Sequence, residues 1–270
     1  MPSFISRRLL SVRELGFASR GAIGLALVGL LATGAWFSPW SPGAMDHAAD
    51  LAARGDTDAA VGVYLRVADG PVLPSMARDA RWQAAWVASV DTTQPQRAVE
   101  LLRDFTSRYP ADPLAAQAFE RLATLYSLYQ GDPVRAAEAW ESAAAVSPAS
   151  PDAGRWLVEA GLAYSDADLP ERAATALRAA TAHPSQAVAA HLGLGRLLLA
   201  QDPAKAYDHY TAALGLARGE QDTTVARLGM ASALEALDRV DQALAELEGA
   251  DGSDPAVARR RARLQARERR

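Results

Sequence analysis

Histidine, aspartate and glutamate are the side chains best suited to acid–base or metal chemistry here, because the chain contains no cysteine. The four histidines, His47, His183, His191 and His209, are scattered over separate predicted helices and loops. A metal site built from them would require separate helices and loops to bring them together. We therefore expect histidines at the surface or at the edge of the core, and neither a metal site nor another cofactor.

Catalytic motifs are also missing from the sequence. It has no glycine-rich phosphate loop, no nucleophile elbow and no calcium-binding loop. Acidic pairs such as Asp166/Asp168 and Asp238/Asp241 fall in predicted turns, where carboxylates commonly cap helices or lie at the surface. The sequence therefore predicts no enzymatic activity and no small-molecule substrate.

A helix pair over residues 117–148 is the clearest structural pattern. In Gln117 to Tyr129, large apolar residues recur at three- and four-residue spacing, which places them on one helical stripe. The same spacing recurs after Pro133 around Trp140. Because Gly131 and Pro133 separate the two runs by a tight turn, the pattern predicts an antiparallel helix pair.

The second half of this pattern occurs six times. Each copy has an alanine followed four residues later by a large residue and three residues after that by another apolar residue. The leading alanines are Ala60, Ala98, Ala136, Ala173, Ala206 and Ala243, spaced 33 to 38 residues apart. Turn residues also recur between the expected helices, at Gly55, Gly131, Asp168 and Asp238. This periodicity predicts tandem helix pairs that share one core.

The repeats resemble the tetratricopeptide repeat (TPR) family, whose unit is a pair of helices in about 34 residues. The resemblance implies an all-α fold: a right-handed superhelical solenoid of about six helix pairs over residues 45–256. Two units depart from the pattern. The first helix before Ala60 is short, and the unit of Ala98 has a long turn from Val90 to Gln96.

The resemblance also implies a binding groove, lined by the first helix of each pair. The residues it places there are Arg121, Leu125, Tyr129, Arg155, Val158, Leu162 and His191. Both arginines are expected to be available to a carboxylate of a bound extended or helical protein segment. Some family members hold a C-terminal carboxylate with paired Asn and Lys residues. This chain has no asparagine and a single lysine, Lys205, so that arrangement is not expected.

Charge is distributed unevenly along the chain, whose net charge is −4. Arginines are concentrated in residues 1–20 and again in residues 257–270, so the repeats between them are acidic. The basic C-terminal segment has no aromatic residue to stack on a base, and we expect no nucleic-acid partner. We expect it to form a capping helix that covers the last repeat with Val257 and Leu264 and keeps its arginines in water.

The N-terminal segment carries an apolar run. No residue from Gly21 to Phe37 is charged, and with Trp40 the run approaches the ~20 residues that span a bilayer. We expect residues 21–40 to be a transmembrane signal anchor and 41–44 a linker. Because the arginines precede the run, the positive-inside rule places residues 1–20 in the cytoplasm and the repeats in the periplasm of a bacterial inner-membrane protein.

Other interpretations of the N-terminus remain open. Thr33-Gly34-Ala35 is an acceptable site for signal-peptide cleavage, which would release a secreted periplasmic protein. Ser6 to Leu10 resembles a twin-arginine export motif, and residues 3–20 share the Arg- and Ser-rich composition of a mitochondrial presequence. Residues 4–17 alone are consistent with an amphipathic helix on anionic lipid.

The sequence thus favours a non-enzymatic protein–protein interaction module. By resemblance we expect a membrane-anchored periplasmic adaptor, scaffold or assembly factor for envelope proteins. The alternative is an accessory subunit of an envelope enzyme or secretion complex.

Overall fold

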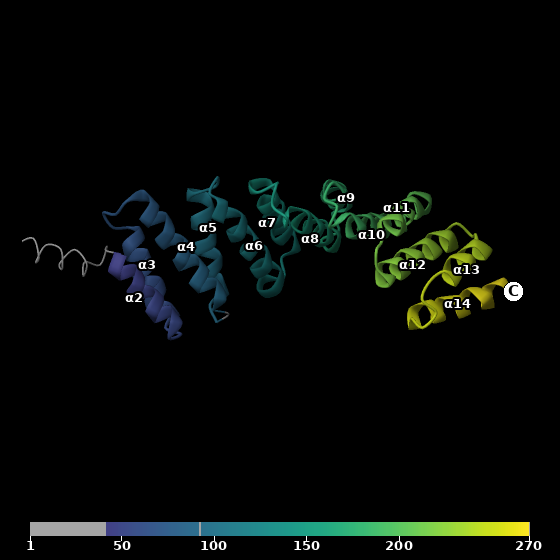
Figure 1. The fold of residues 1–270 in the computed structure, drawn as a ribbon, viewed down its shortest axis with the longest axis horizontal. Coiled ribbons are helices and arrows are strands. Elements are labelled where there is room, and N and C mark those ends of the chain that lie inside the picture. Colours follow the sequence, from purple (N-terminus) through teal and green to yellow (C-terminus); the bar gives the residue numbers. More distant parts are fainter. Residues whose placement is uncertain (1–41, 92, 270) are drawn as a thin grey trace, which may run out of the picture. The chain divides into compact units, whose positions relative to one another are not determined.

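The computed structural model describes residues 42–91 and 93–269, and every regular element in these ranges is helical (Figure 1). The described residues form two compact units that divide after Asp91. We call residues 42–91 unit 1 and residues 93–269 unit 2. The all-α class predicted from the repeat pattern is therefore confirmed for these residues.

Unit 1 contains three helices, α2 (Pro42–Ala53), α3 (Thr57–Ala68) and α4 (Pro74–Val90). Helix α2 begins inside the segment 41–44 that the sequence suggests is a linker, since proline is tolerated in the first helical turn, where its missing N–H would have no helical partner. It is as long as α3, so the expected short first helix is not observed.

Unit 2 begins at α5 (Pro95–Arg108), so the turn after Val90 is shorter than the sequence suggests. The following helices are α6 (Pro113–Leu125), the π-helix η1 (Tyr126–Gln130), α7 (Pro133–Val146), α8 (Ala153–Asp166), α9 (Pro170–Ala180), α10 (Ala187–Leu198), α11 (Pro203–Leu216), α12 (Glu220–Ala236), α13 (Val240–Glu248) and α14 (Pro255–Glu268). Proline begins many of them because the first helical N–H needs no partner. Successive helices pack against each other, and α8 also contacts α10, which contacts α12.

Left-handed backbone marks the turns inside four helix pairs. Among the residues that the structure describes, four have φ between +58° and +82°: Gly55, Gly131, Asp168 and Asp238. These are the turn residues that the repeat pattern singles out. Glycine and, less readily, aspartate adopt this conformation, which lets the chain leave the first helix and reverse direction.

The recurring alanines form the centre of each repeat. All six leading alanines, Ala60, Ala98, Ala136, Ala173, Ala206 and Ala243, are fully buried. They lie on α3, α5, α7, α9, α11 and α13. Since alanine has the smallest apolar side chain, helices can approach closely at these points, as the predicted register requires.

Large residues of the second helices fill the space between neighbouring first helices. A Cβ atom placed on Gly161 of α8 would lie 2.5 Å from Leu177 of α9, and one on Gly193 of α10 would lie 2.9 Å from the same side chain. Tyr210 of α11 fits between Gly195 of α10 and Gly229 of α12 in the same way. Each large side chain therefore joins its own repeat to the next.

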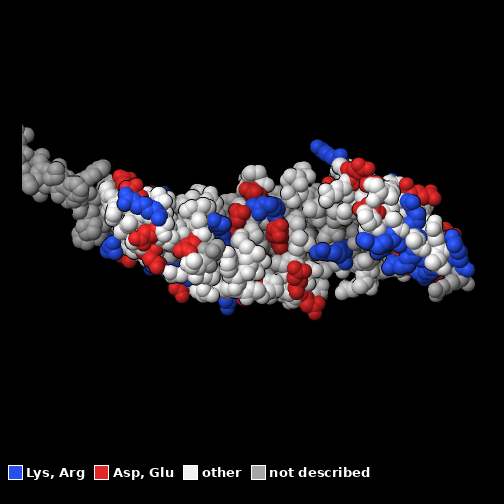
Figure 2. Space-filling view, turned by 90° about the horizontal axis from the view of Figure 1, so that it is seen from below, with Lys and Arg blue, Asp and Glu red and all other residues white. Residues whose placement is uncertain are grey.

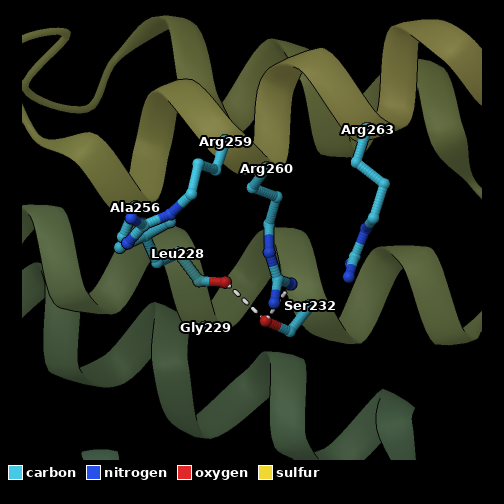
Figure 3. Close-up of a pocket in the computed structure, with 7 residues that line it drawn as sticks. All are labelled: Leu228, Gly229, Ser232, Ala256, Arg259, Arg260 and Arg263. Carbon is cyan, nitrogen blue, oxygen red and sulfur yellow. Dashed lines mark hydrogen bonds between the residues drawn. The ribbon is translucent and has the colours of Figure 1, made fainter.

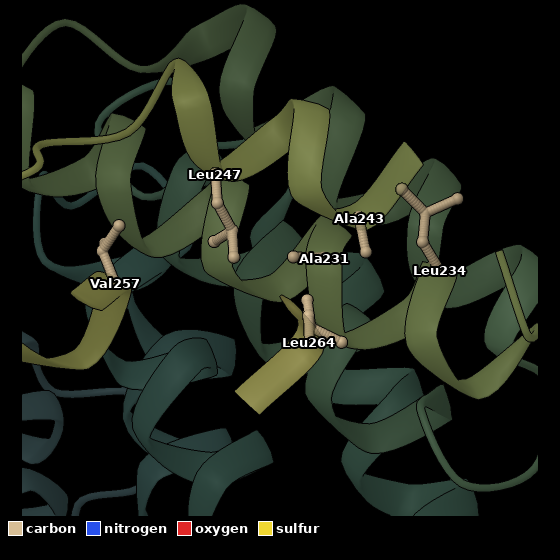
Figure 4. Packing of buried hydrophobic residues seen from close by; sticks show 6 residues of the cluster. All are labelled: Ala231, Leu234, Ala243, Leu247, Val257 and Leu264. Carbon is tan, nitrogen blue, oxygen red and sulfur yellow. The ribbon is translucent and has the colours of Figure 1, made fainter. Parts of the chain in front are cut away.

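Helix α14 covers the last repeat, as the sequence predicts. Val257 and Leu264 are fully buried in a cluster with residues of α12 and α13, namely Ala231, Leu234, Ala243 and Leu247 (Figure 4). Its arginines do not all remain in water, however. Arg261 donates a hydrogen bond of 2.7 Å to the carbonyl oxygen of Leu247, and the Arg260 side chain is largely buried.

Among the helices of residues 42–91 and 93–269, none has the length and apolar character needed to cross a bilayer. The predicted basic segment 1–20 and the predicted transmembrane helix 21–40 lie outside the described residues. Both stay predictions from the sequence.

Candidate functional site

An apolar hollow of ≈ 320 Å³ lies in unit 2, formed by α8, α10 and α12, the first helices of three successive repeats. Its lining residues are Val158, Leu162, Ala189, Leu192, Gly193, Arg196, Tyr210, Val225 and Gly229. Arg196 is the one charged side chain among them. We call this set the apolar hollow.

Tyr210 forms part of the wall of the apolar hollow, although it belongs to a second helix. It comes from the second helix α11 and reaches the hollow because Gly195 and Gly229 leave room for its ring. Burial raises the pKa of Tyr210, so its hydroxyl stays neutral near pH 7. The ring thus contributes an apolar surface rather than a charge.

The hollow is open to solvent at Val225, whose side chain on α12 is 44% exposed. Val158 on α8 lies deeper and is only 7% exposed. This combination offers apolar surface that a neighbouring molecule can cover. An apolar side chain entering the hollow would gain the free energy of leaving water.

Two of the seven predicted groove residues, Val158 and Leu162, line the apolar hollow. Arg155 does not offer a free charge, so that expectation is wrong. Its guanidinium donates to Glu120 at 2.8 Å and to Asp152 at 3.2 Å, and it lies 5.8 Å from the ring centre of Trp140. Arg155 therefore links α8 to α6 of the preceding repeat.

His191 is also engaged within the protein rather than free for a ligand. Its Nδ1 atom lies 3.2 Å from Nδ1 of His209 on α11. Burial lowers the pKa of both histidines, and the neighbouring His191 lowers that of His209 further. Two neutral rings can share one proton across this contact, which joins the two helices of a pair.

The remaining predicted residues lie on α6 and η1, away from the apolar hollow. Leu125 is buried, Arg121 is half-buried, and Tyr129 is exposed on η1. The π-helix explains part of the difference. It inserts an extra residue per turn, so a face projected with 3.6 residues per turn no longer holds beyond Leu125.

Sequence reasoning missed Leu192, Arg196 and Val225. It placed His191 of α10 on the inner face, whereas the neighbouring residue Leu192 lines the hollow. One residue corresponds to about 100° of rotation around a helix, enough to exchange one face for another. The run Leu192 to Arg196 has the i, i+4 spacing of one face, but only packing against α8 and α12 shows which face it is.

No group of three or more His, Asp or Glu side chains arranged to hold a metal ion is found within residues 42–91 and 93–269. The hollow itself combines apolar walls with a single arginine. This arrangement can bind an apolar group, and Arg196 can interact with a negative charge at its edge.

The geometry defines a helical-repeat protein with an apolar hollow along three successive first helices, α8, α10 and α12. No family model and no curated protein matches the sequence. Among solved structures, the chain is similar to YrrB, described as a TPR protein with an unusual peptide-binding site: 17% identity, 70% of this chain and 91% of that chain covered, TM-score 0.52. It is also similar to BtubC from P. vanneervenii, with 17% identity, 80% and 90% coverage and a TM-score of 0.50.

The chain therefore has the tetratricopeptide repeat fold, as its repeats predict.

Proposed function

We propose that this protein is a protein–protein interaction module whose unit 2 holds an extended or helical segment of a partner in the apolar hollow. The proposal rests on the hollow itself. Three successive first helices line it, and its apolar surface is exposed at Val225. Side chains that recur along a partner segment fit pockets formed by successive repeats.

The lining chemistry favours a polypeptide over a polar small molecule. Small-molecule sites combine apolar walls with several convergent polar groups, whereas the side chains that line the hollow include only two with polar groups, Arg196 and Tyr210. The volume of ≈ 320 Å³ suits one or two apolar side chains. YrrB, which shares the fold and has a peptide-binding site, supports this proposal by analogy.

Replacing Val225 by glutamate is expected to weaken partner binding about 10- to 100-fold. One buried apolar side chain contributes roughly 1.5–3 kcal/mol, and about 1.4 kcal/mol corresponds to a factor of ten. The measurement is quantitative recovery of proteins crosslinked to the full-length chain in the cells that make it.

Leu216→Glu is the matched control, because Leu216 is 47% exposed at the end of α11 and does not line the hollow. Both variants should keep the wild-type melting temperature. Equal recovery of the same partners by Val225→Glu, Leu216→Glu and the wild type would rule out the hollow as the binding site.

The proposed setting is the bacterial inner membrane, with the repeats in the periplasm and a role as adaptor or assembly factor for envelope proteins. The support is the uncharged run from Gly21 to Phe37 and the arginines that precede it. An uncleaved anchor should make the protein resist alkaline extraction and keep its N-terminal residues. A soluble protein that begins near Trp36 would instead show that the segment is a cleaved signal peptide.

A further inference from the structure

A second pocket lies between α12 and the capping helix α14, with a volume of ≈ 400 Å³. Three arginines of α14 project from one side of that helix toward α12 (Figure 3). The lining residues are Leu228, Gly229, Ser232, Ala256, Arg259, Arg260 and Arg263. We call this set the arginine pocket. Figure 2 shows Lys and Arg side chains gathered at the C-terminal end of the chain.

The positive charge of the arginine pocket is only partly balanced. Glu235 of α12 contacts Arg263 and lies 3.6 Å from Arg260. Within the part of the chain that the structure describes, Arg259 has no hydrogen bond or ion pair. Glu235 thus pairs with two of the three guanidinium groups.

Arg260 is held in place inside the pocket. It donates a hydrogen bond to the hydroxyl of Ser232, which donates in turn to the carbonyl oxygen of Leu228 at 2.7 Å. Burial and then the like charge of Arg263 lower the pKa of Arg260, although an arginine stays charged at neutral pH. A partly buried guanidinium beside a second one is a favourable environment for an added negative charge.

The arginine pocket adjoins the apolar hollow, since Gly229 of α12 lines both. A partner segment that fills the hollow can therefore continue along α12 toward α14. It would pass from apolar walls to arginines, and Arg196 adds a cation at the edge of the hollow.

We propose that the arginine pocket binds the carboxylates of an acidic stretch in the same partner segment whose apolar side chain occupies the hollow. This inference rests on the proposed function and adds the chemistry of the partner: apolar residues followed or preceded by Asp or Glu. Two observations favour a polypeptide over a nucleic acid. No aromatic side chain lines the pocket to stack on a base, and the chain as a whole carries a net charge of −4, which repels a long polyanion.

The test is selection of peptides from a random phage-displayed library on the full-length chain in detergent. Wild-type protein should enrich peptides in which Asp or Glu lies close to large apolar residues. The double variant Arg259→Gln, Arg263→Gln should keep the apolar preference and lose the acidic one. It should bind the selected peptides at least ~10-fold more weakly, because each charge-assisted hydrogen bond is a strong contact.

The control is the double variant Arg267→Gln, Arg269→Gln on the same helix. Arg267 pairs with Asp238 at 2.6 Å, and Arg269 has no ion pair among the described residues. Each double variant therefore removes two positive charges and one exposed ion pair. The control should bind the selected peptides within about twofold of wild type, because neither residue lines the pocket.

The outcomes separate this inference from the proposed function. Enrichment of apolar peptides without acidic residues, or an acidic preference that survives Arg259→Gln, Arg263→Gln, would overturn the inference alone. No enriched motif on wild-type protein would overturn both. Two other anions are compared with the selected peptides: phosphatidylglycerol vesicles and a 20-nucleotide single strand. If either binds through Arg259 and Arg263 more tightly than any selected peptide, the pocket binds that anion instead, and the inference is overturned.

Discussion

Replacing Leu264 by alanine is expected to lower the free energy of unfolding of unit 2 by about 2–5 kcal/mol. Leu264 lies on the buried face of α14, in the same cluster as Leu234 and Leu247 (Figure 4). The substitution removes apolar contacts and leaves a cavity where the last repeat is covered. Denaturant unfolding followed by circular dichroism measures the loss.

The control for this substitution is Leu216→Ala, because the side chain of Leu216 is 47% exposed. Surface substitutions of this kind usually stay within about 0.5 kcal/mol. Repeat proteins unfold in part by opening from their ends, so hydrogen exchange should show the loss first in α13 and α14. Similar effects of the two substitutions would contradict the role of α14 as a cap.

Replacing Gly229 by alanine is expected to destabilise unit 2 by about 1–2 kcal/mol. The added Cβ atom would lie 2.4 Å from two ring atoms of Tyr210, which is buried between Gly229 and Gly195. Overpacking destabilises by about 1–3 kcal/mol, and the better helix propensity of alanine offsets up to about 1 kcal/mol of this loss.

Gly215→Ala on α11 is the control for Gly229→Ala, since nothing lies within 4 Å of its added Cβ atom. At this position only the better helix propensity of alanine acts, so we expect the free energy of unfolding to rise by up to about 1 kcal/mol. In the background of Tyr210→Leu, Gly229→Ala should cost much less, because the two residues are in contact and their effects couple. An undiminished cost in that background would mean that the ring is not what Gly229 accommodates.

The repeat architecture could be predicted because its determinants are local. Alanines such as Ala136 and Ala206 mark the close contacts of helix pairs, and both are fully buried. Turn residues such as Gly131 and Asp168 adopt the left-handed backbone that ends a first helix. These features recur with the repeat and depend on neighbours only a few residues away.

The candidate site was harder to predict, because it depends on contacts between repeats. Arg155 is neutralised by Glu120, which lies 35 residues away, and Arg172 pairs with Glu138 at a separation of 34 residues. Partners one repeat apart do not show in the spacing within a single helix. The rotation of α10, which exposes Leu192 to the hollow and turns His191 toward His209, is likewise set by packing.

Site-specific crosslinking at the apolar hollow shows directly whether a partner protein occupies it. A diazirine amino acid about the size of leucine is placed at Val225 of the full-length chain, and in a separate variant at Leu216, in the cells that make the protein. We expect illumination to link Val225 to a discrete partner protein and to leave Leu216 unlinked. No product at Val225, or the same products from both positions, would show that the apolar hollow does not hold a partner segment.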